Sequence, residues 1–473
     1  MTLAHKTRAG LSRDKASGPI YLFLLVALGA QTMIVELAIP RLLAPAFGNT
    51  LYCWTAIITV VLVALSAGYY VGGRMAARGH GSHLVSVLSS LSALWVVGIA
   101  FMGASVTSLL SPFGLMAGPL ITASVLAAFP AGCGAAVIPL VVETRSEQAG
   151  EAAGQCYAWS TVGSVFGVLL TGYVLLPQFG ISGAMMTGAV VVFLVVLMRG
   201  PRLLGLVGLI AVSGWLFSPK TEAEALFDKS NGYHRIRIAA SPQDQNVRAL
   251  YLDSTREGAV RLGSSDPVLG YQKNVRQFVE TIPRLSHALF IGGGAFTLPR
   301  YIKASFPHAV VDVVELDPDV VDSAYKYLEL GSDVNVLVGD GRQVLRSRDV
   351  IYDLIVNDAF NGFRKIPFHL VSREFNGLVK RRLSPEGVYA VNVIGHAAKS
   401  SLVASVLRTL MKEFENVSLF RRHKGNIWIL ASQTSVTPGD APPKEKMGGQ
   451  VLTDNHSPVE FLIVKDLIRA QLR

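Results

Sequence analysis

The fold of the second half of this chain is decided by five apolar runs, ALFIGGG (residues 288–294), VVDVVELD (310–317), VNVLVGDG (334–341), DLIVNDAF (353–360) and GVYAVNVIG (387–395). Each run has the length and composition of a buried strand, and helices are expected between the runs. Strands that alternate with helices predict a parallel, doubly wound α/β sheet.

A different pattern precedes this series. Short alternating runs at 233–240 (YHRIRIAA) and 247–253 (VRALYLD) predict a small β-hairpin region, and a helix is expected over 267–281. We therefore divide the polar half into a β-hairpin region, 219–264, and an α/β domain, 265–473.

The first half of the chain has the composition of a membrane protein. Of the 473 residues, 51% are hydrophobic and 16% are charged, which excludes a disordered or collagen-like protein. Residues 1–218 hold 10 Lys/Arg and 5 Asp/Glu, about 7% charged, whereas residues 219–473 hold 33 and 28, about 24%, close to the usual globular value. We expect an α-helical transmembrane bundle over 19–218 behind a cytoplasmic tail, 1–18.

The bundle is predicted to contain six to eight helices. A bilayer core needs about 20 apolar residues per helix. Such stretches lie at 19–39, 51–74, 84–106, 117–142, 155–176 and 181–198, with a shorter one at 203–217. Basic residues precede the first stretch and occupy alternate loops, which predicts a cytoplasmic N-terminus. The side of the polar half depends on whether 203–217 crosses the membrane or an eighth helix is hidden.

Two features of the bundle bear on its packing. Gly163 and Gly167 recur at a spacing that lets helices approach closely. Glu36 is the one acid inside an apolar stretch, and an unpaired carboxylate in hydrocarbon is costly. Glu36 is expected either to pair with Arg41 or Arg74, which we favour, or to contact a cationic substrate.

Polar residues follow the predicted strands at the edge where ligands bind in doubly wound sheets. The first strand runs into Gly292, Gly293 and Gly294, which let a ligand approach the backbone where a Cβ would collide. The second ends in Glu315, 21 residues after Gly294, where an acid can accept both hydroxyls of a ribose. Asp317 follows, either as a further ligand or as a cap of the next helix.

The third and fourth strands also end in carboxylates. Asp340 and Gly341 follow the third, where a carboxylate can hold an adenine amino group, and Asp358 follows the fourth. These features, taken in strand order, indicate a nucleoside-binding site. Because no Walker-type lysine follows the glycines, the pattern suits an adenosyl sulfonium better than a nucleotide phosphate. Such a sulfonium is S-adenosylmethionine or its decarboxylated form.

A family resemblance is carried by GYHRIRI, GYQKN, IGGGAFTLPR, VVELDP, VGDGR, YDLIVNDAFNG, IPFHLVSREF and LTDNHSPVE, and in the apolar half by PRLLAPAFGNTLYCWTAII and AGQCYAWSTVGSVFGVLLTGYVLLP. With these segments the polar half resembles the spermidine synthases, the polyamine aminopropyltransferases. The whole chain resembles the bacterial membrane-fused members of that superfamily. The resemblance implies a Rossmann-like (class I methyltransferase-like) sheet and a homodimer.

The resemblance also implies a reaction and a donor site. An aminopropyl group would pass from decarboxylated S-adenosylmethionine to a di- or polyamine, releasing methylthioadenosine. Asp358 corresponds to the catalytic aspartate, which takes a proton from the attacking amine. Gln272 would contact the donor, Glu315 its ribose and Asp340 its adenine. The three glycines after the first strand, together with Gly341, would complete the donor site.

The expected amine-binding positions match those of the soluble spermidine synthases less well than the donor-binding positions do. Tyr271, Glu257 and Asn361 are expected to bind the substrate. Soluble spermidine synthases have an aspartate directly after the glycine triplet, where this chain has Ala295, and they have a second acid where it has Asn361. The first change leaves the donor open between decarboxylated and ordinary S-adenosylmethionine, and the second leaves the acceptor amine open. Glu257, near a hairpin glutamine of the soluble enzymes, would restore one negative charge.

Other polar residues carry weaker signals. His369 and His396 are expected to be hydrogen-bonded structural residues, and no His/Cys cluster has the spacing of a metal site. Asp454, His456 and Glu460 either close over the active site or cap a C-terminal helix.

Three functions therefore stand side by side: a membrane-anchored aminopropyltransferase, an S-adenosylmethionine-dependent methyltransferase motivated by Ala295, and a transporter or sensor that binds a nucleoside or polyamine without turnover, with Glu36 on its path. Because the donor is made in the cytosol, the enzyme hypotheses place the α/β domain on the cytoplasmic side of the inner membrane. Neither half has a long basic run of the kind that binds nucleic acid. The expected partners are the lipid bilayer, a small amine and a second copy of the chain.

Overall fold

The computed structural model describes residues 18–48, 50–79, 81–145, 149–199, 213, 225–231, 233–253, 255–282, 284–360, 366–395, 400–423, 425–434, 439 and 448–471. The chain divides into two compact units, a helical one from residues 1–221 with 230–232, and an α/β one from 222–229 with 233–473. Four expectations lie outside the described residues: the tail before Gly18, the seventh apolar stretch at 203–217, Asn361 and His396.

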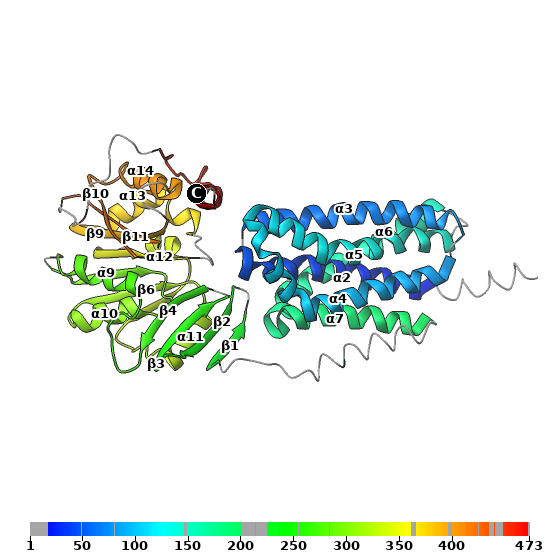
Figure 1. Ribbon diagram of the computed structural model, residues 1–473, viewed down its shortest axis with the longest axis horizontal. Coiled ribbons are helices and arrows are strands. Elements are labelled where there is room, and N and C mark those ends of the chain that lie inside the picture. Colours follow the sequence, from blue (N-terminus) through cyan, green and yellow to red (C-terminus); the bar gives the residue numbers. More distant parts are fainter. Residues whose placement is uncertain are drawn as a thin grey trace, which may run out of the picture. The chain divides into compact units, whose positions relative to one another are not determined.

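In the described part of the helical unit, a helix forms at each of the six longer apolar stretches (Figure 1). The helices are α2 (Gly18–Phe47), α3 (Leu51–Ala76), α4 (Gly81–Leu110), α5 (Gly114–Thr144), α6 (Ala149–Leu170) and α7 (Leu176–Arg199), with the short turns η1 (Ser111–Phe113) and η3 (Thr171–Leu175) between them. Four continuous helical stretches in the described part are long and apolar enough to cross a membrane: Pro19–Phe47, Leu51–Ala76, His83–Thr144 and Gly150–Met198.

The third and fourth stretches are each long enough for two crossings. A straight helix of 62 residues, the length of the third stretch, would measure about 93 Å, some three times the bilayer core. A glycine in the left-handed region interrupts each of them, Gly114 (φ 76°) before α5 and Gly180 (φ 66°) near the start of α7. Glycine adopts this conformation without the strain that a Cβ would bring.

Helix α6 packs closely on α2 through its glycines. A Cβ on Gly163 would lie 2.1 Å from Val26 O, and one on Gly167 would lie 2.6 Å from Ala30 Cα. Neither distance leaves room for a side chain, so the predicted close packing at these two glycines is confirmed.

The favoured pairing of Glu36 is wrong. Arg74 donates instead to Tyr70 Oη (3.0 Å), one turn earlier on α3, and lies over the tyrosine ring. Among the described residues, no basic side chain lies within 4.0 Å of the Glu36 carboxylate. Arg74 thus has a hydrogen-bond partner within α3. The spacing of charges along the chain did not indicate this contact.

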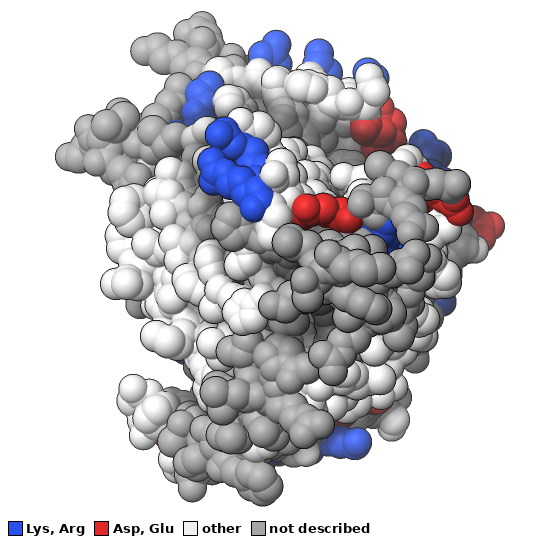
Figure 2. Space-filling view, turned by 90° about the vertical axis from the view of Figure 1, so that its right-hand side faces the viewer, with Lys and Arg blue, Asp and Glu red and all other residues white. Residues whose placement is uncertain are grey.

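Basic residues gather at one end of the bundle. Helices α2, α4 and α6 begin there, and α3, α5 and α7 end there (Figure 1). Arg74 lies in the last turn of α3, Arg145 follows α5 and Arg199 ends α7. Figure 2 looks onto this end and shows Lys and Arg side chains together with several Asp and Glu side chains. The basic residues that occupy alternate loops of the sequence thus lie at the same end of the bundle.

The α/β unit begins with a four-stranded antiparallel sheet in chain order: β1 (Phe227–Ser230), β2 (Arg235–Ser241), β3 (Asp244–Leu252) and β4 (Thr255–Arg261). Alternate residues of β2, Ile236 and Ile238, are buried, as the alternating pattern predicts. Helix α9 (Gly270–Val279) follows within the predicted range.

The larger sheet has seven strands in the order β10-β11-β9-β8-β5-β6-β7. The five predicted runs form its parallel strands, β5 (His287–Ile291), β6 (Val310–Glu315), β7 (Asn335–Val338), β8 (Tyr352–Asn357) and β9 (Leu383–Ile394). The chain passes from β5 to β6 and β7 and then returns to β8 and β9 on the other side of β5. In doubly wound sheets ligands bind beyond the carboxyl ends of the strands at such a reversal, which here lies at β5 and β8.

Two strands outside the predicted series complete the sheet. Strand β11 (Asn426–Ser432) is antiparallel both to β9 and to β10 (Asn416–His423). The turn between β10 and β11 contains Gly425 (φ 96°) and is far too short for the crossover that parallel neighbours require. The sheet is therefore mixed: the five predicted strands are parallel, and the two strands that the sequence did not predict are antiparallel at this edge.

Helices cover both faces of the larger sheet. Ala288 and Phe290 of β5 belong to a core with α9, α10 (Thr297–Ser305) and α11 (Pro318–Tyr327). Leu289 and Ile291 of the same strand belong to a core with α12 (Gly341–Ser347), α13 (Arg373–Arg382), α14 (Ser401–Leu410) and α15 (Val459–Gln471). Burial on both faces explains why the strand sequence is continuously apolar.

Candidate active site

The glycine loop after β5 brings two strand ends together. Gly292 and Gly294 have positive φ angles of 96° and 51°, which glycine adopts at least cost. A Cβ on Gly292 would lie 2.8 Å from Asp358 O, and Asp358 N donates to Ile291 O (3.0 Å). The loop therefore lies directly beside Asp358, at the crevice that the strand order creates.

Glu315, the last residue of β6, holds the same loop. Its Oε2 accepts hydrogen bonds from Gly293 N (2.8 Å) and Gly294 N (3.3 Å), and its Oε1 accepts one from Asp317 N (3.0 Å). Burial raises the pKa of Glu315, and these backbone donors partly oppose the rise. Asp317 caps α11 by accepting from Asp319 N (2.9 Å). Of the two roles expected for Asp317, it therefore has that of a helix cap.

Asp358 is held by a relay of asparagines from neighbouring strands. Its Oδ1 accepts from Asn392 Nδ2 (2.7 Å) on β9, and Asn392 Oδ1 accepts from Asn426 Nδ2 (3.2 Å) on β11. Burial raises the pKa of Asp358 to about 7, although the Asn392 donor opposes the rise. Near neutral pH such a carboxyl is present both as acid and as base, which suits general base catalysis.

The opposite wall comes from β4 and α9. Tyr271 Oη donates to Glu257 O (3.3 Å) and accepts from Gln272 Nε2 (3.3 Å). Burial raises the pKa of Glu257 to about 8, and the negative charge of Asp358 is the next largest cause of the rise. The carboxylates of β4 and β8 therefore lie close enough to repel each other.

Two buried acceptor atoms in this wall have no hydrogen-bond partner among the described residues: Gln272 Oε1 and Glu257 Oε1. Gln272 is 4% exposed, and its Nε2 is already used by Tyr271. An unsatisfied buried acceptor costs free energy that a bound donor would recover. The wall thus favours a ligand with N–H or O–H groups, and a bound cation would favour the ionised form of Glu257.

Asp340 follows β7 and caps α12. Its Oδ1 accepts from Gln343 N (2.9 Å), and its Oδ2 lies 2.8 Å from His369 Nε2. Burial acts to raise the pKa of Asp340, but the Gln343 and His369 bonds outweigh it and the pKa is lowered. His369 is hydrogen-bonded, as predicted. A Cβ on Gly341 would lie 2.4 Å from Ile291 Cγ2, so a glycine lets α12 pack against the end of β5.

Three further positions complete the account. Ala295 is 2% exposed and faces β4. A Cβ on Gly258 of that strand would lie 2.5 Å from the Cβ of Ala295. Asn392 and Asn426 are residues that sequence reasoning missed. The available signal for Asn392 was a lone polar side chain inside the otherwise apolar run at 387–395.

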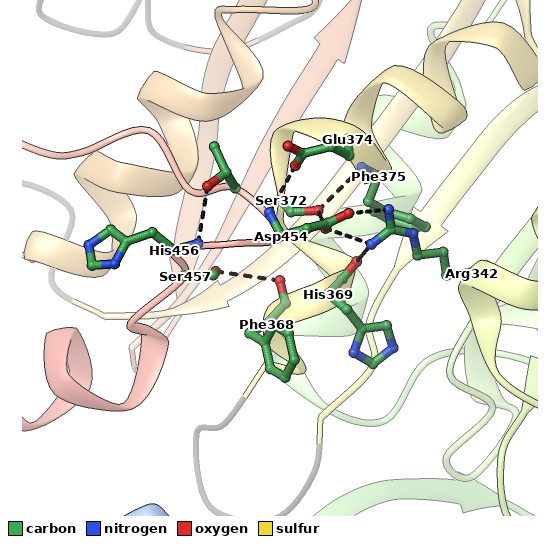
Figure 3. A network of polar contacts seen from close by, with 10 residues as sticks. Arg342, Phe368, His369, Ser372, Glu374, Phe375, Asp454, His456 and Ser457 are labelled. Atoms are coloured by element: carbon green, nitrogen blue, oxygen red, sulfur yellow. Dashed lines mark hydrogen bonds and ion pairs between the residues drawn. The ribbon is translucent and has the colours of Figure 1, made fainter.

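The C-terminal candidates take different places. Asp454 accepts two hydrogen bonds from the Arg342 guanidinium (2.7 and 2.6 Å) and does not cap α15, which begins at Val459 (Figure 3). His456 closes a tight turn with Thr453, and Glu460 lies in the first turn of α15. Within the described residues, no group of three or more His, Cys, Asp or Glu side chains could hold a metal ion.

Comparison with known proteins agrees with this geometry. Residues 270–427 match the spermine/spermidine synthase domain. Over these residues the chain is similar to the spermidine synthases. Its spermidine synthase-like segment contains Gln272, the glycine loop, Glu315, Asp340 and Asp358.

The matches to individual relatives cover only part of each relative's length. A polyamine aminopropyltransferase of Vibrio vulnificus is 32% identical over 159 residues, 33% of this chain and 52% of the relative. A probable polyamine aminopropyl transferase of Bifidobacterium longum is 36% identical over 106 residues, 22% of this chain and 24% of the relative. The chain thus spans about half, or less, of these two proteins. A probable spermidine synthase from Corynebacterium glutamicum aligns in structure at 23% identity, covering 49% of this chain and 90% of that one, with a TM-score of 0.41.

Proposed function

We propose that this protein is an aminopropyltransferase that uses decarboxylated S-adenosylmethionine to alkylate a di- or polyamine and releases methylthioadenosine. One observation carries the proposal. Asp358, a carboxyl with a pKa raised to about 7, stands at the reversal point of the sheet between the glycine loop and Glu257. A base with a second carboxyl nearby, at the strand ends where such sheets bind nucleosides, is what transfer to a polyamine requires.

Asp358 serves as the base in this proposal. The amine nitrogen attacks the propyl carbon beside the sulfonium, and the N–C bond forms as the C–S bond breaks. The electron pair of the C–S bond returns to sulfur, which leaves as the neutral thioether of methylthioadenosine. The proton released by the nitrogen passes to Asp358. Because Asn392 occupies Oδ1, Oδ2 is the atom assigned to receive it.

The acids of the opposite wall bind the amine. The charge of Asp358 raises the pKa of Glu257, and a polycation between the two carboxylates relieves that repulsion. The acceptor atoms Gln272 Oε1 and Glu257 Oε1 receive N–H groups of the donor or the amine, and Tyr271 keeps both residues in place. Asn361, outside the described residues, is kept as an amine ligand on the resemblance alone.

The adenosine end of the donor lies along the other strand ends. Glu315 accepts the ribose hydroxyls, and its bonds to the glycine loop orient it for that role. Asp340 accepts the adenine amino group, and Gly341 lets the helix behind it pack closely. The three glycines of the loop leave the backbone open to the sulfonium side of the nucleoside.

A second candidate is methyl transfer from ordinary S-adenosylmethionine. Ala295, buried against β4, leaves the end of the glycine loop without an acid of its own, so a donor carboxylate meets less repulsion there. Glu257 argues against this candidate, because its carboxylate lies in the same wall as Gln272, which is assigned to the donor.

We further propose that the protein is a homodimer in the inner membrane with its α/β unit in the cytoplasm. Six crossings return the chain to the side on which it entered, and the basic end of the bundle marks the cytoplasmic side. The homodimer is proposed on the resemblance. Reporter fusions after Lys220 test the side: cytoplasmic-type activity is expected, and periplasmic-type activity refutes the topology.

The reaction is tested by mass spectrometry of the nucleoside product. The full-length protein is given each sulfonium donor with a panel of amines. Methylthioadenosine from the decarboxylated donor is expected, and Asp358→Asn should lower kcat by about 10²- to 10⁴-fold. The matched control is Asp349→Asn, which changes a 98% exposed aspartate paired with Arg382 and should leave the rate unchanged. Formation of S-adenosylhomocysteine selects the methyltransferase, and the absence of any nucleoside product with every amine refutes both.

A further inference from the structure

The segment Gln450–Ser457, here called the C-terminal strap, is fastened to the α/β unit by its backbone. Leu452 O accepts from Arg373 N (2.8 Å) on α13, and Leu452 N donates to Thr409 Oγ1 (2.9 Å) on α14. Both bonds fix the strap from the side of the sheet that α12, α13 and α14 cover. These two bonds therefore fix the position of the strap residues that follow Leu452.

At Asp454 the strap contacts α12 (Figure 3). The carboxylate accepts from Arg342 Nη1 (2.7 Å) and Nη2 (2.6 Å), a bidentate geometry, and from Ser372 Oγ (2.6 Å) at the start of α13. Asp454 N donates in turn to Glu374 Oε2 (3.0 Å). The Arg342 donors lower the pKa of Asp454, with a smaller contribution from Ser372, although burial opposes this. The strap, α12 and α13 are thus joined at one carboxylate.

Arg342 connects this junction to the donor site. It lies in the first turn of α12, two residues after Asp340, and its Nη1 also donates to His369 O (3.4 Å) in the turn η4 (Phe368–Leu370). The His369 ring then contacts Asp340 Oδ2 (2.8 Å). Helix α12 has only seven residues, too few to be stable by itself. Its position depends on anchors of this kind.

We propose that Arg342 and Asp454 are positioning residues for the nucleoside end of the donor. By fixing the first turn of α12 and the turn η4 to the strap, they hold the Asp340 carboxylate where an adenine amino group can donate to it. They act on donor affinity and leave the transfer step at Asp358 unchanged. This inference rests on the proposed function for the identity of the ligand.

Calorimetric titration of the full-length protein with methylthioadenosine tests the proposal. Asp454→Asn and Arg342→Gln should each raise the Kd about 10-fold, the effect of one lost charge-assisted hydrogen bond. Both should raise the KM for the donor by a similar factor with kcat unchanged, and exchanging the pair, Arg342→Asp with Asp454→Arg, should recover part of the affinity. The matched control is Arg373→Gln, which breaks the ion pair with Glu413 (2.7 Å) and should leave the Kd unchanged.

An unchanged Kd in both single variants overturns the proposal, as does an equal loss in the Arg373 control or a fall in kcat at constant KM. If Arg342→Gln does not fold, Arg342→Lys keeps the charge without the bidentate geometry and should give a smaller rise in Kd. A protein that binds methylthioadenosine in this way but forms no product with any amine refutes aminopropyl transfer and leaves the positioning role standing. A wild-type protein that binds neither methylthioadenosine nor S-adenosylhomocysteine overturns both.

Discussion

Replacement of Asn392 by leucine tests how the pKa of Asp358, the proposed base, is set. Leucine has a similar shape to asparagine but lacks the Nδ2 group that donates to Asp358 Oδ1 (2.7 Å). The donor stabilises the ionised carboxylate, so its removal raises the pKa of Asp358 above its present value of about 7. The ionised form is the one that accepts the proton from the amine.

The size of the effect follows from the bond that is lost. A hydrogen bond to a charged group contributes about 1.5–3 kcal/mol, and about 1.36 kcal/mol corresponds to one pKa unit. Asn392→Leu should therefore raise the pKa of Asp358 by about 1–2 units and move the acid limb of the kcat/KM profile to higher pH by the same amount. At pH 7 the activity should fall about 5- to 50-fold and should recover in more alkaline buffer.

The assay is the pH dependence of kcat/KM for methylthioadenosine release. Asn426→Ala, which removes only the donor to Asn392 Oδ1, should produce a smaller shift in the same direction. The control Asn416→Leu loses a bond to the backbone of Gln433 and should produce none. An acid limb that stays in place while activity falls at every pH refutes the reasoning, because Asn392 would then act only through the fold.

Two further predictions concern stability. Asp358→Asn should raise the Tm of the full-length protein at pH 8. The folded-state pKa of about 7 lies above the ordinary aspartate value of 3.8, so the wild-type protein loses stability as the pH rises from the lower value to the higher, by an amount of the order of a few kcal/mol. The gain should vanish near pH 4, and a lower Tm than wild type at pH 8 would contradict the assignment. In the helical unit, Gly163→Ala forces a Cβ to 2.1 Å from Val26 O and should lower the Tm, whereas Gly172→Ala meets nothing within 4 Å and should not. Equal losses in the two glycine variants would refute the packing argument.

The parts of the fold that the sequence predicted correctly are those with a local cause. The apolar runs of β5 to β9 are buried on both faces, and Leu289 and Phe290 lie in different cores although they are neighbours. Asp358 and Glu315 were predicted to share an edge because the carboxyl ends of parallel strands lie together. The structure indeed brings Gly293 into contact with Glu315 and Gly292 beside Asp358.

The errors have a common origin in contacts between distant residues. Strands β10 and β11 follow the predicted series and turn back on themselves, which the alternation of strands and helices before them did not indicate. Glu36 was expected to pair with Arg41 or Arg74, whereas Arg74 donates to Tyr70 of its own helix. Of the two roles expected for Asp454, the helix cap is wrong, because its partner is Arg342, 112 residues earlier.

The sequence by itself determined the division into an apolar and a polar half, the order of the strands along the chain and the acids at the strand ends, because composition and periodicity are local properties of the chain. Only the tertiary structure decided which of those acids have pKa values that suit catalysis, since burial of Asp358 and its bond to Asn392 depend on how three strands pack side by side. It also decided that Asp340 is tied through His369 and Arg342 to the C-terminal strap. These bonds join residues 27 to 112 positions apart, and no periodicity along the chain encodes them.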